Sequence, residues 1–206
     1  MPKLQVIGGI LSPVSDGYGK KGLAPAADRV EMCRLAVHDS DWIFADEWEA
    51  VQPKWMRTRL VLEHFVDELN ADKPAEPVHV MLLSGGDLVD SFATPDLWMP
   101  EDVRLSPCIS PPPPPIQLSH LQLEVIVGKL GIVVIERQGT DLGKVIRDSP
   151  ILSKYAIGER IFVVPQPVAN DISSTKVREL IKADRSITYL TPPAVIRYIR
   201  EKNLYC

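Results

Sequence analysis

The chain has 206 residues, of which 45% are hydrophobic and 24% charged, so it can bury the core of a single domain spanning residues 1–206. Its net charge of -4 leaves no surplus of cations to neutralise a run of phosphates, which argues against nucleic-acid polymers and anionic membranes as partners. The cysteines and histidines lack metal-ligand spacing, so no protein-bound metal is expected. The N-terminal apolar run is too short for a signal peptide or a membrane span, and the cytoplasm and the nucleus both stay open.

Strand and helix patterns alternate along the chain. In order they are a strand at 4–11, a helix beginning at Pro25, a helix at 53–69, strands at 78–83, 131–135 and 161–164, and helices at 174–183 and 192–202. The run at 78–83 is nearly all apolar, as in strands buried on both faces of a parallel sheet. The helix at 53–69 is expected to carry Trp55, Leu62 and Phe65 on one face. This order predicts an α/β fold with a parallel sheet flanked by helices.

A proline-rich segment at about 105–127 does not fit this pattern. Pro111 to Pro115 are consecutive, and proline neither donates backbone hydrogen bonds nor fits a helix interior or a central strand. The segment is either a polyproline ligand for an SH3 or WW domain or a solvated insertion. The insertion is favoured, because no lysine or arginine flanks the prolines to orient a partner.

Three hydroxyl residues, Ser173, Ser174 and Thr175, stand where the helix at 174–183 begins, and Arg178 follows one turn later. Asn170 and these hydroxyls could simply cap the helix. Alternatively, unpaired backbone N–H groups, hydroxyls and a guanidinium on one face suit a phosphate group. From the residues alone, the cap and the phosphate cradle are equally supported.

The turn Ser84-Gly85-Gly86-Asp87 follows the strand at 78–83. Ligands of open α/β sheets bind outside the carboxyl ends of strands, where Gly85 would allow close approach and Asp87 could accept hydrogen bonds from a ribose. The alternative is a tight turn into the next helix, capped by Asp87, and it is favoured if this motif is taken alone.

Two further features are candidates for binding. Tyr18 and Lys20 lie on a glycine-rich loop that could close over an anion, although a pair of lysines such as Lys20 and Lys21 is usually solvated surface. Trp48 and Trp98 stand among acidic residues, where an indole can edge a pocket and stack on a flat ring. The alternative is partial burial against the sheet, and it is favoured from the residues alone.

Taken together, these segments resemble the eukaryotic nicotinamide mononucleotide adenylyltransferases of the nucleotidyltransferase superfamily. The matching segments, in the family's order over about four-fifths of the chain, are SPVSDGYGKKGL, PAADRVEMCRLA, ADEWEA, LLSGGDLVDSFATPDLW, GIVVIERQG, NDISSTKVR and SITYLTPPAVIRYIREKNLY. The resemblance implies a Rossmann-like fold. It also implies the reaction of ATP, with Mg²⁺, and nicotinamide or nicotinic acid mononucleotide to give the dinucleotide and pyrophosphate, and it leaves a homo-oligomer open.

The resemblance also implies roles for the candidate residues. ATP would be bound by Gly85 and Asp87 at the ribose and by a second set of residues at the phosphates, namely Asn170, Ser173, Ser174, Thr175 and Arg178. The pyridine nucleotide would be bound by Tyr18, Lys20, Trp48 and Trp98. Lys20 and Arg178 would act in catalysis by neutralising phosphate charge.

The chain departs from the family pattern in two places. The family begins with a strand, a Gly-Ser-Phe-x-Pro signature and a phosphate-binding histidine, and no such element precedes the strand at 4–11. The proline-rich segment replaces a short family segment. Our hypothesis for both is an irregular gene prediction or splice. The alternative function is a catalytically inactive nucleotide-binding or proline-rich interaction protein derived from this family.

Overall fold

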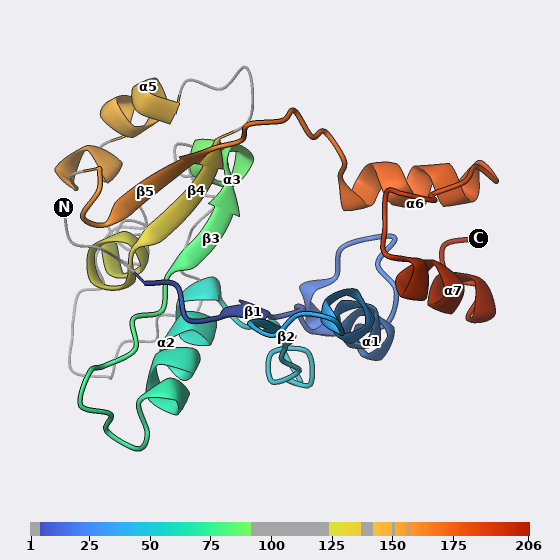
Figure 1. Cartoon of the computed structure of the whole chain (residues 1–206), viewed down its shortest axis with the longest axis horizontal. Coiled ribbons are helices and arrows are strands. Elements are labelled where there is room, and N and C mark those ends of the chain that lie inside the picture. The colour runs from blue at the N-terminus through green and yellow to red at the C-terminus, as the bar shows by residue number, and fades with distance from the viewer. Residues whose placement is uncertain (1–4, 92–123, 137–141, 150, 156) are drawn as a thin grey trace, which may run out of the picture. The chain divides into compact units, whose positions relative to one another are not determined.

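The structure is a computed structural model that describes residues 5–91, 124–136, 142–149, 151–155 and 157–206 (Figure 1). Its contacts divide the chain into two compact units. The middle unit contains residues 58–170, and the terminal unit combines residues before 58 with residues 171–206. Each unit is described by itself below.

The middle unit is built on three parallel strands in the order β3 (Leu82–Gly85), β4 (Ile132–Glu136) and β5 (Ile161–Pro165). Parallel neighbours need crossover connections, and the described parts of these connections contain helices. Helix α3 (Gly86–Ser91) follows β3, and the helical segment η2 (Val125–Leu130) precedes β4. Helix α5 (Leu142–Asp148) and the short η3 (Leu152–Lys154) lie between β4 and β5, and α2 (Thr58–Leu69) begins the unit.

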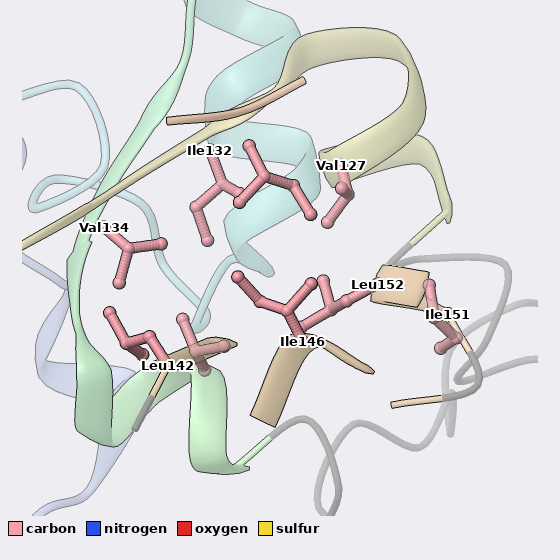
Figure 2. Close-up of a cluster of buried hydrophobic side chains, with 9 residues drawn as sticks. Val127, Ile132, Val134, Leu142, Ile146, Ile151 and Leu152 are labelled. Carbon is pink, nitrogen blue, oxygen red and sulfur yellow. The ribbon is translucent and has the colours of Figure 1, made fainter. Parts of the chain in front are cut away.

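The core of the middle unit lies where β4 meets these helices (Figure 2). Ile132 and Val134, two residues apart on β4, point to the same face and are fully buried. They pack with seven other apolar residues: Val89, Val127, Leu142, Ile146, Ile151, Leu152 and Ile161. Burying one such side chain contributes about 1.5–3 kcal/mol, so this cluster fixes β4 and the carboxyl end of β3 beside it.

The terminal unit joins the two ends of the chain. Strand β1 (Gly9–Leu11) pairs in parallel with β2 (Ile43–Ala45), and α1 (Ala26–Val37) connects them. Helices α6 (Ser174–Lys182) and α7 (Pro193–Glu201) come from the other end of the chain. Their apolar sides share one cluster with α1, which consists of Ile187, Val195, Ile196 and Ile199 with Met32, Leu35, Val177, Leu180, Ile181, Leu204 and Tyr205.

The predicted α/β class, with parallel sheets flanked by helices, is confirmed, and three element predictions are wrong in detail. The strand predicted at 4–11 is shorter, because the chain before Gly9 lies outside the ladder with Val6 and Ile7 exposed. The strand predicted at 78–83 occupies Leu82–Gly85 instead. Burial there alternates, with Leu83 66% exposed and Ser84 8% exposed, so this strand is not buried on both faces.

The helix predicted at 53–69 begins at Thr58. Trp55 therefore lies before the helix, where its ring contacts Tyr18 rather than joining a helix face. The proline-rich segment lies almost wholly outside the described residues. Among the helices that the structure describes, none is both long enough and apolar enough to cross a membrane.

Candidate functional site

Two hydroxyl side chains at the N-terminus of α6 accept hydrogen bonds from different partners. Ser173 has an extended backbone, and its Oγ accepts a hydrogen bond of 3.2 Å from the Lys176 backbone N–H, which makes it the N-cap. Thr175 Oγ1 accepts a bond of 3.2 Å from Nη2 of Arg178. The predicted cap is confirmed, and a single hydroxyl provides it.

This helix end also has the charge that an anion requires. The first N–H groups of a helix have no intrahelical acceptor, and they carry the positive end of the macrodipole. None of the first-turn residues of α6 is acidic. The Ser174 side chain is exposed, and Arg178, four residues later and so on the same side of the helix, bonds Thr175 with its guanidinium. An anion with several oxygens can therefore bind N–H groups, a hydroxyl and a guanidinium at one place.

The loop carrying Tyr18 and Lys20 lies against the segment before α2. The Tyr18 and Trp55 ring centroids are 6.0 Å apart, and Tyr18 remains 46% exposed. A Cβ atom on Gly17 would come within 2.7 Å of the Trp55 backbone nitrogen, so the two backbones approach as closely as glycine allows. Gly19 ends the short helical turn η1 (Asp16–Tyr18) with φ at 66°, a conformation that glycine adopts without strain. Lys20 follows on the exposed side.

Trp48 lies half-buried in the segment after β2. Its backbone N–H donates to the carboxylate of Asp46 over 2.7 Å, and its carbonyl accepts from the Gln52 side chain over 2.9 Å. The next residue, Glu49, is 6% exposed and accepts a 2.6 Å hydrogen bond from Ser12 Oγ. The segment that carries Trp48 is therefore joined, through the hydrogen bond between Ser12 and Glu49, to the start of the loop that carries Tyr18.

In the middle unit, Gly85 closes β3 and leads directly into α3. Among the described residues, no heavy atom lies within 4 Å of a Cβ atom built on Gly85, which leaves room there for the close approach of a ligand. Asp87 lies in the first turn of α3, although its side chain is outside the described residues. Asn170 is exposed after β5.

The predicted site residues fall on both units. The terminal unit carries Tyr18, Lys20, Trp48, Ser173, Ser174, Thr175 and Arg178, and the middle unit carries Gly85, Asp87 and Asn170. Trp98 lies outside the described residues. In the part of the chain that the structure describes, no group of three or more His, Cys, Asp or Glu residues could hold a metal ion.

Sequence reasoning missed three residues that organise this region. Burial raises the pKa of Glu49, while the Ser12 hydrogen bond and then the Arg29 charge act against that rise. Burial likewise raises the pKa of Tyr205, whose hydroxyl meets the backbone of Ala24 and the charges of Arg178 and Arg29. Arg29 resembles an ordinary helix residue in the sequence, and nothing there distinguishes it.

Comparison with known proteins identifies relatives of this chain over almost its whole length. The chain is 40% identical to nicotinamide/nicotinic acid mononucleotide adenylyltransferase 2 of Saccharomyces cerevisiae over 98% of its own length and 48% of the yeast protein. It is 40% identical to the rice (Oryza sativa subsp. japonica) nicotinamide/nicotinic acid mononucleotide adenylyltransferase over 97% of its length and 72% of that protein. For nicotinamide/nicotinic acid mononucleotide adenylyltransferase 2 of Caenorhabditis elegans, the identity is 38% over 98% and 83%.

Residues 3–180 match the family model described as cytidylyltransferase-like. The chain belongs to the cytidylyltransferase-like family and, within it, to the nicotinamide/nicotinic acid mononucleotide adenylyltransferases. The family resemblance expected from the sequence is thereby confirmed. This adenylyltransferase-family chain spans about half the length of the yeast relative and larger fractions of the rice and nematode relatives.

Proposed function

We propose that this chain joins ATP to nicotinamide mononucleotide, or to its nicotinic acid form, to give the dinucleotide and pyrophosphate. The names of the relatives support this reaction. The structural observation that carries the proposal is the start of α6, where Ser173 caps the helix and Arg178 donates a hydrogen bond to Thr175 in the first turn. This arrangement suits the polyphosphate of ATP.

The chemistry requires no general base. The 5′-phosphate of the mononucleotide is already an anion, and one of its oxygens attacks the α-phosphorus of ATP. A new phosphoanhydride bond forms, the bond between the α- and β-phosphates breaks, and pyrophosphate leaves with the electron pair. Rate enhancement then comes from in-line positioning and from cations that neutralise developing charge. Hydroxyl, lysine and arginine side chains without a catalytic triad are sufficient for this task.

Each candidate residue then has a role. Arg178, Ser174 and Thr175 would bind the phosphates of ATP, and Ser173 would cap the helix that presents them. Asn170, just before this helix, would also bind ATP. Gly85 and Asp87 would contact the ribose. Lys20 would pair with phosphate on the mononucleotide side, and Tyr18, Trp48 and Trp98 would line or edge the pyridine pocket. Mg²⁺ would arrive with ATP as part of the substrate.

Light scattering of the purified chain tests for a homo-oligomer, and cell fractionation tests whether the protein lies in the cytoplasm or the nucleus.

Replacement of Arg178 by alanine tests the proposal. A charge-assisted hydrogen bond contributes about 1.5–3 kcal/mol, so ATP affinity measured by titration calorimetry should fall by about 10- to 100-fold. Arg185→Ala is the matched control, because Arg185 is an exposed arginine just after the same helix. A folded Arg178→Ala protein with unchanged ATP affinity would contradict the proposal. ATP binding without dinucleotide formation in the unaltered chain would favour an inactive nucleotide-binding protein.

A further inference from the structure

Arg29, on α1, bonds three separate points of the loop at residues 12–24. Its Nε donates to the Ala24 carbonyl over 2.9 Å, and its Nη1 donates to the Val14 carbonyl over 2.6 Å. Its Nη2 donates to Oδ1 of Asp16 over 3.0 Å. The side chain is only 11% exposed. Because a guanidinium presents its donors in a rigid planar fork, three acceptors around it fix both its orientation and theirs.

In the sequence, these acceptors lie on both sides of Tyr18 and Lys20, the two loop residues with candidate roles in binding. Val14 and Asp16 precede Tyr18 and Lys20, and Ala24 follows them, so Arg29 holds the loop on both sides of its exposed part. The Tyr205 hydroxyl also interacts with the backbone of Ala24, on the same side of the loop as the bond from Arg29 Nε. The exposed part of the loop therefore begins and ends at fixed points.

Other contacts fix the loop at single places. The hydroxyl of Ser12 donates to the buried Glu49, and Gly17 lies against the Trp55 backbone. Arg29 differs from these contacts because it bonds both the stretch before Tyr18 and the stretch after Lys20. Removing it would take one contact away from each side of the exposed part at once, while the contacts of Ser12 and Gly17 remain.

We infer that Arg29 is a positioning residue for the pyridine-nucleotide side of the site, acting through Tyr18 and Lys20 without touching the substrate. The identity of the substrate rests on the proposed function, whereas the hold on the loop does not. Since the start of α6 makes none of these three contacts, ATP binding should depend on Arg29 far less than binding of nicotinamide mononucleotide.

The experiment compares Arg29→Ala and Arg29→Lys with Arg34→Ala. Arg34 is the matched control, an exposed arginine on the same helix whose Nη2 pairs with Glu47 over 2.7 Å. Hydrogen exchange of peptides covering residues 12–24 should become at least about 10-fold faster in Arg29→Ala and stay unchanged in Arg34→Ala. Lysine has no fork with which to bond three acceptors at once, so Arg29→Lys should behave much like Arg29→Ala.

Steady-state kinetics supply the second measurement. In Arg29→Ala, KM for nicotinamide mononucleotide should rise and kcat/KM for it should fall by about 10- to 100-fold, as a displaced binding group causes, while KM for ATP stays within about twofold. A merely structural role would reduce the amount of active protein, lowering the apparent kcat and leaving both KM values unchanged. Unchanged exchange in the loop, or a normal KM for nicotinamide mononucleotide, would overturn the inference.

Failure of this inference is distinguishable from failure of the proposed function. If the unaltered chain forms no dinucleotide, the proposed function fails, and hydrogen exchange alone decides whether Arg29 holds the loop. If Arg29→Ala does not fold, Asp16→Ala removes one of the three contacts from the exposed side. It should accelerate exchange in the same peptides by a smaller factor, and no acceleration there would count against the hold on the loop.

Discussion

Tyr198 on α7 donates a 2.7 Å hydrogen bond to Oδ1 of Asp28 on α1, joining two residues that are 170 positions apart. Beside this bond, the apolar sides of α1, α6 and α7 share one cluster. The same helix α1 carries Arg29, and α6 carries Arg178. The terminal unit thus fixes, relative to one another, the helices that carry the loop anchor and the candidate phosphate site.

Replacing Tyr198 with phenylalanine should lower the free energy of unfolding by about 1 kcal/mol at pH 7, because a partly buried bond to a carboxylate is lost. The bond to Asp28, followed by burial, raises the pKa of Tyr198 from 10.0 to about 12. A raised pKa means that the contribution is fully present below pH 10 and is lost as the pH rises from about 10 to about 12. Urea unfolding at pH 7, 10 and 12 tests both statements.

In the Tyr198→Phe protein, the loss of stability between pH 10 and pH 12 should be smaller than in the unaltered chain. An equal alkaline loss in both proteins would mean that this phenol is not the group responsible.

The two serines at the start of α6 should separate stability from binding. Ser173→Ala removes the cap and should cost about 1 kcal/mol of stability. Ser174 is exposed, so Ser174→Ala should change stability by less than about 0.5 kcal/mol. Under the proposed function, Ser174→Ala should nevertheless weaken ATP binding several-fold. Thermal unfolding and ATP titration of both variants provide the measurements. The prediction is wrong if Ser174→Ala lowers stability and Ser173→Ala does not.

Gly17→Ala should open the contact between the Tyr18 loop and the segment before α2. The added Cβ would lie 2.7 Å from the Trp55 nitrogen and 3.2 Å from the Lys54 carbonyl carbon, and backbone atoms cannot turn aside as a side chain can. We expect a loss of about 1–3 kcal/mol of stability. Gly8→Ala is the control, since its nearest contact would be an ordinary 3.5 Å from the Trp42 oxygen. Equal stability of the two variants in urea would contradict the close approach.

Glu49→Gln should change how stability depends on pH. Burial raises the pKa of Glu49, so its contribution to stability is fully present below 4.5 and is lost as the pH rises through the raised pKa. Glutamine carries no charge to bury, and its amide oxygen can still accept from Ser12. The variant should gain most relative to the unaltered chain near pH 7, and this gain should shrink toward pH 4.5. Urea unfolding across this range, with the partly exposed Glu63→Gln as control, measures the difference.

The sequence predicted well those features whose signals are local. The predicted boundaries of α6 agree with the observed ones within one residue, because consecutive residues determine its cap and its amphipathic turns. Strand β3 was placed too early, since an apolar run does not reveal where pairing with β4 begins. Trp55 was assigned to a helix because its spacing fitted one, and its contact with Tyr18 depends on distant backbone.

The site was predictable only in part for the same reason. The hydroxyls and Arg178 are neighbours in sequence, so their grouping could be predicted. The importance of Arg29 arises from acceptors at Val14, Asp16 and Ala24, which meet it only after folding. Its sequence surroundings are those of an ordinary helix, and they carry no sign of these bonds.

The terminal unit also constrains how the chain emerges during synthesis. Helix α1 leaves the ribosome with Met32 and Leu35 facing partners that lie on α6 and α7. At about 5–20 residues per second, translation from α1 to α6 takes roughly 10–30 s, during which those side chains have no native neighbours from the other end of the chain. Arrest of translation before residue 174 would leave Met32 and Leu35 without these neighbours.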